Sequence, residues 1–94
     1  MSEMAPVAYR VRSKVVENAE SVTLCLEPTI TELSAPRPGE FMMLYAYGVG
    51  EIAISVSGDP SLTDGTITHT IRSVGAVSAA LCAVEPGATV GVRG

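Results

Sequence analysis

An alternation of apolar and polar residues, repeated in short runs, constrains the fold of this chain more than any other feature. The clearest run covers residues 7–15. Its apolar face carries Val7, Tyr9, Val11 and Val15, and its polar face carries Arg10, Arg12 and Lys14. A period of two residues is typical of a half-buried β-strand, because successive side chains of a strand point to opposite faces. We therefore expect a strand here, with its basic side chains in solvent.

Further short segments follow the same logic, and glycine and proline separate them. Strands are expected at residues 22–27, 41–47, 51–57, 66–74 and 89–92, with irregular connections at 28–39 and 61–65. The run 41–47 is continuously apolar, which predicts a strand that is buried on both faces or covered on its second face. The alanine-rich segment 76–84 favours a short helix. Short strands, many turns and one helix predict an all-β fold, a closed or nearly closed antiparallel barrel.

Length and composition limit the number of domains and the classes of partner. A chain of 94 residues is expected to form a single domain, residues 1–94. The formal net charge is −4 and the basic residues are scattered, which argues against nucleic-acid binding. Neither a membrane-spanning stretch nor a signal-like start is visible in the sequence. We therefore expect a soluble, cytoplasmic protein that binds neither nucleic acid nor membranes.

The cysteines and the single histidine do not form a recognisable reactive or metal-binding group. Cys25 and Cys82 lie far apart in the sequence, and together with His69 they are too few for a tetrahedral zinc site. A disulfide is left open, but reduced and partly buried thiols are expected. His69 shares a strand face with Ile67 and Ile71, which favours a packed histidine over a catalytic base. No catalytic residue and no metal are predicted.

The junction between the expected fifth strand and the helix, residues 75–78, is a local pattern that suits a ligand. A helix start exposes unpaired backbone N–H groups and the positive end of the helix dipole, and both favour an anion such as phosphate. The same arrangement is often only a helix cap, with Ser78 near the start of the helix. Both interpretations stay open on the local sequence alone.

Four segments, in this order, resemble the FAD-binding domain of the ferredoxin–NADP reductase superfamily. They are Pro38-Gly39-Glu40-Phe41-Met42-Met43-Leu44, Ala53-Ile54-Ser55-Val56-Ser57, residues 70–81 and residues 85–94. Each motif is modest alone, but the ordered set is fairly specific, and the resemblance extends from about residue 9 to residue 94. Within the superfamily, the chain looks most like the gamma subunits of sulfhydrogenases and the electron-transfer subunits of dihydroorotate dehydrogenases.

The resemblance implies a six-stranded antiparallel Greek-key barrel with one short capping helix and with FAD along one side. The family motif, an arginine followed two residues later by an aromatic or aliphatic residue and then a serine, falls on residues 52–55. By resemblance, Ile54 packs on the isoalloxazine and Ser55 lies near its reactive edge. Ile52 stands where the family has an arginine that holds a flavin phosphate. Isoleucine offers no such bidentate donor, and this is the main departure from the family pattern.

The second family motif, Gly-x-x-Ser/Thr, falls on residues 75–78. By resemblance, Ser78 and nearby backbone N–H groups receive the pyrophosphate, in agreement with the argument from the helix start. Arg72 is the cation close enough in sequence to replace part of the missing charge, and its strand would run beside the flavin. The resemblance thus implies FAD contacts at Ile54, Ser55, Thr70, Ile71, Arg72, Gly75, Val77 and Ser78.

The resemblance also implies a function for the parent protein. The chain is expected to be the FAD-binding domain of an oxidoreductase subunit that passes electrons between NAD(P)H and an iron–sulfur partner. Family chains continue with a nucleotide-binding domain and, in the most similar members, a [2Fe–2S] segment. Residues 1–94 are therefore expected to be truncated before that domain and inactive alone. Apolar surface left by the absent domain would favour a homodimer of the isolated barrel.

Two alternatives compete with this hypothesis. The barrel could keep the fold, bind no flavin and act as a docking module, and the isoleucine at residue 52 is the main support for that alternative. An unrelated barrel of the translation-factor type has an ending similar to residues 86–94, but it explains only the last strand.

Overall fold

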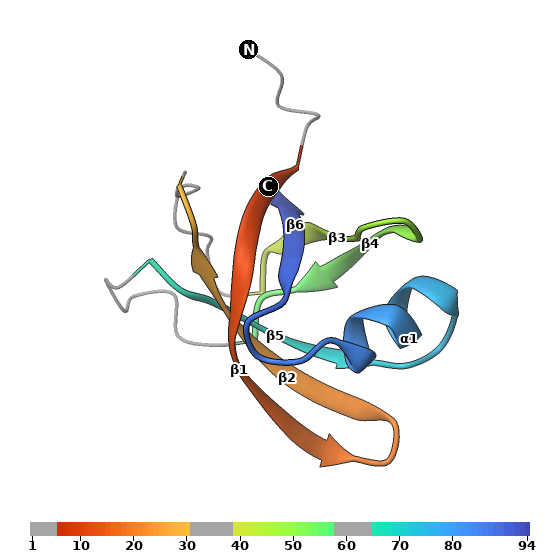
Figure 1. The fold of residues 1–94 in the computed structure, drawn as a ribbon. Helices are drawn as coiled ribbons and strands as arrows, with labels where there is room; N and C mark the ends of the chain where they lie inside the picture. Colours follow the sequence, from red (N-terminus) through yellow and green to blue (C-terminus); the bar gives the residue numbers. More distant parts are fainter. Residues whose placement is uncertain (1–5, 31–38, 58–64) are drawn as a thin grey trace.

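The computed structural model describes residues 6–30, 39–57 and 65–94, and Figure 1 shows their arrangement. In chain order the elements are β1 (Val7–Asn18), β2 (Ser21–Pro28), β3 (Phe41–Ala46), β4 (Gly50–Ser55), β5 (Ile67–Arg72), α1 (Ala76–Ala83) and β6 (Thr89–Arg93). The predicted strands and helix are confirmed, with ends that differ by a few residues. The connections predicted to be irregular lie mostly outside the described residues.

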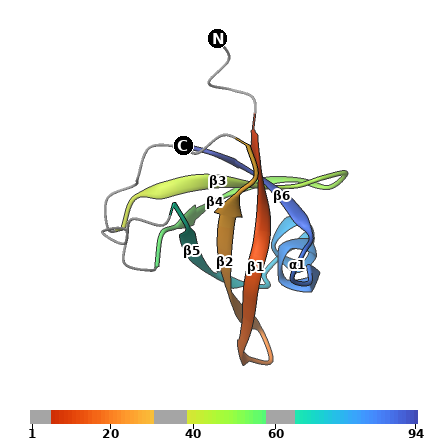
Figure 2. The same ribbon diagram turned by 60° about the vertical axis from the view of Figure 1, so that its left-hand side comes forward.

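The strands form one antiparallel sheet in the order β4-β3-β6-β1-β2-β5. The last strand of the sequence, β6, inserts between β3 and β1, as expected for a Greek-key connection. The sheet curls so strongly that its two edge strands, β4 and β5, approach each other (Figures 1 and 2). No regular ladder joins these edges within the described structure, so the predicted all-β barrel is a nearly closed one.

The core lies inside the curled sheet and follows the predicted alternation. Its buried strand residues are Tyr9, Val11, Val22, Leu24, Leu26, Met42, Leu44, Ala46, Ile67, Ile71, Val90 and Val92. α1 packs against β3, β4 and β5 and adds Leu81 to this core. β3 alternates between buried and more exposed residues, so the first alternative for the run 41–47, burial on both faces, is wrong.

A bulge in β1 reverses the predicted faces of its second half. The pairing of β1 with β2 shifts register between Val11 and Ser13. Beyond the shift, Lys14 lies opposite the buried Leu24 and its side chain is 14% exposed, whereas Val15 is 53% exposed. One extra residue in a strand turns the following side chains to the other face. The expectation that Lys14 lies in solvent and Val15 in the core is therefore wrong.

The described part of the chain contains free cysteines and no cluster of side chains suited to a metal ion. Cys25 and Cys82 are free and half-buried, and burial raises the pKa of the Cys82 thiol. Among the described residues, no group of three or more histidine, cysteine or acidic side chains is placed to hold a metal ion. No helix in the described part of the chain has the length and apolar character needed to cross a membrane.

Gly91 of β6 lies where neighbouring elements leave no room for a side chain. A Cβ at this position would lie 2.8 Å from the Cβ of Pro6 and 2.9 Å from the Cβ of Tyr45. We expect Gly91→Ala to lower the free energy of unfolding by about 1–3 kcal/mol, because the added methyl group must displace these carbon atoms. Urea unfolding measures the change. The control is Gly94→Ala, whose Cβ would meet only the end of Met42 at 3.5 Å, and equal stability of the two variants would contradict the prediction.

Candidate functional site

Within the described residues, β4 and β5 are paired at one end alone. We call the boundary between these two strands, from that end to the start of α1, the seam. At its narrow end Val56 and His69 form an isolated antiparallel bridge, and the Ser57 N–H donates to the Thr68 carbonyl at 2.9 Å. Toward α1, no ladder joins the two strands within the described residues. At this wide end α1 packs against both strands, and a Cβ on Gly50 would lie 3.2 Å from a methyl group of the helix.

The residues predicted to contact a cofactor all flank this seam. β4 carries Ile54 and Ser55, β5 carries Thr70, Ile71 and Arg72, and the start of α1 carries Gly75, Val77 and Ser78. These segments come from different parts of the sequence, and the curling of the sheet brings them to one region. The contact of each residue with a ligand stays a prediction.

At the end of β4, Ser55 is exposed, whereas Ile54 is half-buried and packs against the core. Ile54 lies opposite Met42 and Ile52 lies opposite Leu44, and both β3 partners are buried. Ile52 thus shares the core-facing side of the strand. Ile52, at the position of the family arginine, therefore packs toward the core and places no positive charge at the seam.

The β5 residues differ in what they present to the seam. Ile71 is fully buried in the core, so a ligand could reach only its backbone. Thr70 is exposed, and its hydroxyl lies 2.8 Å from the Thr23 hydroxyl and 3.2 Å from the Ser57 hydroxyl. These contacts tie β5 to β2 and to the residues that follow β4. Thr70 therefore helps to hold the narrow end of the seam.

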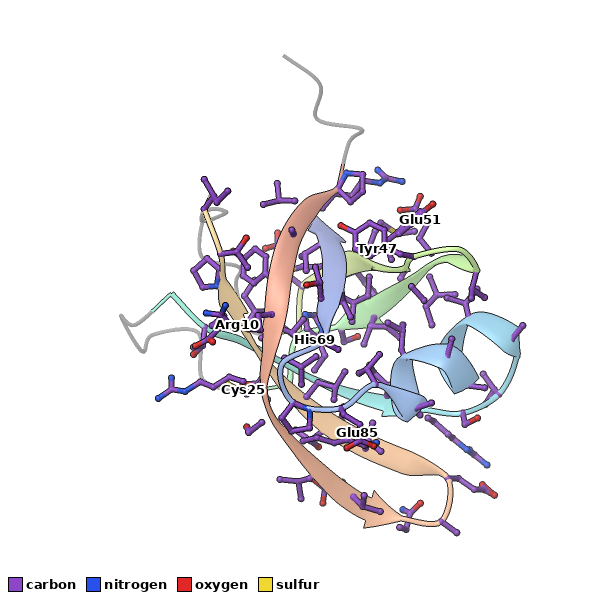
Figure 3. The ribbon with its side chains drawn as sticks, in the orientation of Figure 1. Arg10, Cys25, Tyr47, Glu51, His69 and Glu85 are labelled. Atoms are coloured by element: carbon purple, nitrogen blue, oxygen red, sulfur yellow. The ribbon has the colours of Figure 1, made fainter. Side chains whose placement is uncertain are left out.

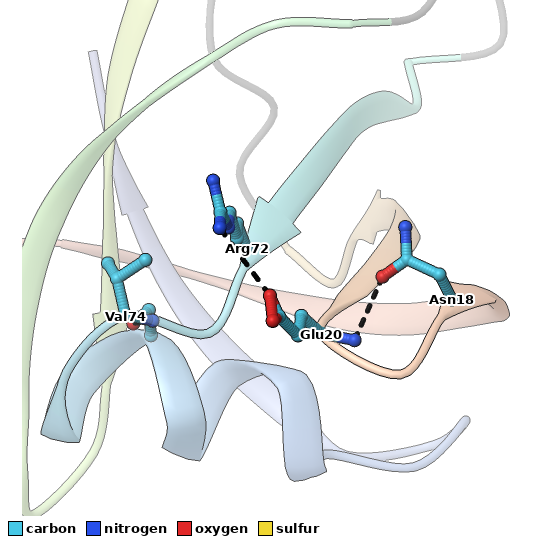
Figure 4. Close-up of polar contacts among 5 residues, drawn as sticks. Asn18, Glu20, Arg72 and Val74 are labelled. Atoms are coloured by element: carbon cyan, nitrogen blue, oxygen red, sulfur yellow. Dashed lines mark hydrogen bonds and ion pairs between the residues drawn. The ribbon is translucent and has the colours of Figure 1, made fainter.

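Arg72, the last residue of β5, forms an ion pair with the turn between β1 and β2. Its guanidinium lies 3.5 Å from the Glu20 carboxylate, and 71% of its side chain is exposed (Figure 4). The backbone of Glu20 is held, because its N–H donates to the Asn18 side chain at 2.8 Å and its carbonyl accepts the Ser73 N–H at 2.7 Å. Exposed ion pairs contribute only about 0–1 kcal/mol. Arg72 can therefore turn from Glu20 toward an anion at little cost.

The Ser78 hydroxyl organises the start of α1. It accepts the N–H groups of Val74 at 2.8 Å and Gly75 at 2.9 Å, and it donates to the Gly75 carbonyl at 3.2 Å. Ser78 is buried, so this hydroxyl acts inside the turn. The N–H groups of Ala76 and Val77 lie in the first helical turn, where no intrahelical acceptor exists for them. An anion at the helix start would meet these amides, presented by a turn that Ser78 shapes.

We expect Ser78→Ala to lower the free energy of unfolding by about 1–3 kcal/mol, because two N–H groups at a partly buried turn lose their acceptor. Denaturant unfolding measures the loss. The matched control is Ser73→Ala, at an exposed serine that precedes the same turn, for which a change within about 0.5 kcal/mol is expected. Similar small effects in both variants would show that the Ser78 hydroxyl does not hold this turn.

His69 belongs to this region although the local sequence pattern gave it no role there. It is fully buried among the strands (Figure 3), and its Nδ1 lies 3.1 Å from the Ser55 carbonyl oxygen. A carbonyl oxygen only accepts hydrogen bonds, so Nδ1 carries the hydrogen and Nε2 is unprotonated. Nε2 is buried without a hydrogen-bond partner among the described groups. The predicted packed histidine is confirmed, and its bond to Ser55 depends on the non-local approach of β5 to β4.

Burial lowers the pKa of His69 from 6.5 to about 4, and the hydrogen bond to Ser55 opposes this shift only in part. The unfolded chain therefore binds a proton at a higher pH than the folded chain, so stability is lost as the pH falls from about 6.5 to about 4. The shift corresponds to about 3 kcal/mol of unfolding free energy. We expect the free energy of unfolding of the wild-type protein to fall by about 3 kcal/mol between pH 6.5 and about pH 4. His69→Asn should not show this decrease, because it lacks the titrating imidazole. Urea unfolding at several pH values measures both, and parallel profiles would contradict the prediction.

Phe41 is a second residue at the narrow end that the sequence pattern did not assign. It lies directly opposite Ser55 in the β3–β4 register, and it is 64% exposed. Side chains opposite each other on antiparallel strands share a face, with Cβ atoms about 4.5–5.5 Å apart. An exposed aromatic ring therefore lies beside the Ser55 side chain. The continuous apolar run around Phe41 concealed this, because it resembles a core strand.

Comparisons with known proteins agree with this fold. No family model matches the chain. Over 68 residues, or 72% of this chain, it is 37% identical to the sulfhydrogenase 1 subunit gamma of Pyrococcus furiosus, of which it covers 23%. It also matches an intact type IV self-sufficient cytochrome P450 monooxygenase with a TM-score of 0.79 at 20% identity, over 97% of this chain and 12% of that chain.

A further match is the cytochrome b5 reductase domain of Ulva prolifera nitrate reductase. Its TM-score is 0.77 at 18% identity, over 100% of this chain and 41% of that chain. The chain thus has the same fold as these structures, and it is similar in sequence to the sulfhydrogenase subunit. The resemblance stated from the sequence is thereby confirmed. The barrel spans less than a quarter of the sulfhydrogenase subunit's length.

A second arginine near β4, Arg93, is already paired with a carboxylate. Arg93 of β6 donates to both carboxylate oxygens of Glu51 on β4, at 2.6 and 3.1 Å. The hydrogen bond from Arg93, more than its charge alone, holds the pKa of the Glu51 carboxyl below its usual value. The two charges compensate each other. Among the described residues of the seam, Arg72 and the helix start are therefore the groups best suited to attract an anion.

Proposed function

We propose that this chain is the FAD-binding barrel of an oxidoreductase subunit that passes electrons between NAD(P)H and an iron–sulfur partner. The observation that carries the proposal is the convergence on one seam of the motif residues of β4, β5 and α1. The homologue is a subunit of a sulfhydrogenase, and one structural neighbour is a cytochrome b5 reductase domain. These relationships favour a flavin-binding redox subunit over the flavin-free docking module.

The seam offers different chemistry at its two ends, and both ends suit a flavin dinucleotide. Exposed Ser55 and Phe41 at the narrow end present a hydroxyl and an aromatic face to a flat ring. At the wide end, the amides of Ala76 and Val77 and the loosely paired Arg72 suit a pyrophosphate. A strand rises about 3.3 Å per residue, so the 6 residues of β4 extend along the seam for roughly 20 Å.

When bound, a flavin would supply hydride and single-electron transfer, while the protein supplies position and electrostatics. Because Ile52 brings no cation, backbone amides and Arg72 would carry the recognition of the phosphates. The affinity for FAD would then depend on the amides at the start of α1. A charged side chain placed near these amides would change that affinity.

The direct test is a titration of the purified chain with FAD and with FMN, followed by flavin fluorescence and visible absorption. We expect FAD to bind with a dissociation constant in the micromolar range, about 8 kcal/mol, and FMN to bind at least about tenfold more weakly. Binding of neither flavin would overturn the proposal and favour the docking module. Equal affinity for both would retain a flavin site but remove the pyrophosphate from the helix start.

Charge at Ala76 separates cofactor binding from folding. Ala76 is exposed at the first position of α1, where an acidic side chain stabilises the helix but repels a phosphate. We expect Ala76→Glu to weaken FAD binding about five- to tenfold while the free energy of unfolding stays equal or rises slightly. Ala76→Gln is the uncharged control of the same size. Unchanged FAD affinity in Ala76→Glu would place the phosphates elsewhere.

The proposal extends to the surroundings of the barrel in its parent protein. There, a nucleotide-binding domain would deliver electrons from NAD(P)H and an iron–sulfur partner would exchange them with the flavin. We place this assembly in the cytoplasm, and we expect the isolated barrel to lack activity toward NAD(P)H and to dimerise through its exposed apolar side chains.

A further inference from the structure

A fully buried histidine with an unused nitrogen needs an explanation that packing alone does not give. His69 occupies a core position between Ile67 and Ile71 on β5, where an apolar side chain would leave no unsatisfied atom. Instead its Nε2 is buried without a partner among the described groups. Buried polar atoms without partners are rare in folded proteins, and they concentrate where function requires them. The other ring nitrogen of His69, Nδ1, has a hydrogen-bond partner.

Nδ1 of His69 donates to the carbonyl of Ser55, the last residue of β4, at 3.1 Å. The N–H of the same peptide unit, on Val56, donates to the Glu40 carbonyl at 2.9 Å. The Ser57 N–H then donates to a β5 carbonyl at 2.9 Å. The peptide that follows Ser55 is therefore fixed from both sides, and His69 supplies the bond that comes from the core.

We propose that His69 is a positioning residue for the cofactor: its Nδ1–H holds the Ser55 carbonyl and so fixes the Ser55 side chain at the narrow end of the seam. The inference rests on the proposed function, because it assigns Ser55 to the flavin end of the site. Ser55 itself is exposed and its side chain lies beside Phe41, so its direction is set by its own backbone. Without the histidine, the Ser55 carbonyl would lose its partner and the end of β4 could turn away from β5.

Three variants separate this role from simple core packing. His69→Phe keeps an aromatic ring and removes the donor. His69→Asn places a side-chain N–H close to the position of Nδ1. Leu24→Val is the matched core control, because Leu24 lies opposite His69 on β2, is fully buried and makes no polar contact with Ser55.

The first measurement needs no flavin: amide hydrogen exchange at Val56 and Ser57, with the Val11 amide as an internal reference. Val11 is bonded to Ala88 at 2.8 Å, in a different part of the sheet. We expect His69→Phe to accelerate exchange at the two seam amides about tenfold relative to Val11. His69→Asn should stay within about twofold of wild type, and Leu24→Val should accelerate all three amides alike.

The second measurement is FAD affinity and the visible absorption spectrum of the bound flavin. We expect His69→Phe to weaken FAD binding about fivefold or more and to shift the spectrum, with His69→Asn restoring both. If wild type binds FAD and His69→Phe changes neither exchange nor affinity, the inference is overturned while the proposed function stands. The inference is also overturned if Leu24→Val reproduces the changes of His69→Phe. If wild type binds no flavin, the proposed function fails, and the exchange data alone show whether His69 holds Ser55.

Discussion

The main constraint on this structure is that one curled sheet forms the barrel and that its edge strands, β4 and β5, pair only in part. Within the described residues, five of the six contacts around the barrel are regular ladders. The sixth, between β4 and β5, consists of the bridge of Val56 with His69 and a few hydrogen bonds beside it. A sheet that closed fully would use all backbone groups of its edges. Here no ladder joins the edges toward α1 within the described residues, and the helix packs against both strands there. The candidate site thus lies where these two strands do not form a ladder.

Much of this fold follows from the sequence because alternation is a local signal. Most strands are visible as a period of two, β3 as a continuous apolar run, and the helix as an alanine-rich segment between a glycine and a proline-glycine turn. The bulge in β1 was not visible, because an extra residue changes which face Lys14 occupies without changing the alternation. The exposure of Phe41 was hidden for a related reason: a continuous apolar run does not reveal which face is covered.

The candidate site was predictable in its location but not in its internal contacts. The motif residues around Ser55 and Ser78 mark the two ends of the seam, and the structure places them on neighbouring elements. The hydrogen bond of His69 to Ser55 joins residues on different strands, and no periodicity within β5 could indicate it. Likewise, the two N–H groups held by the Ser78 hydroxyl became visible only with the geometry of the turn. The local sequence identifies candidate residues, and the tertiary structure determines which of their polar atoms already have a hydrogen-bond partner.

The position of β6 has a consequence for how the protein can be made. β6 pairs with β1 on one side and with β3 on the other, so residues 89–93 connect the group β3–β4 to the group β1–β2–β5. During synthesis on the ribosome, the two groups would be joined only by the packing of α1 and by the short bridge of the seam until these residues leave the exit tunnel. The barrel is therefore expected to complete late, after nearly all of the residues up to β6 have emerged.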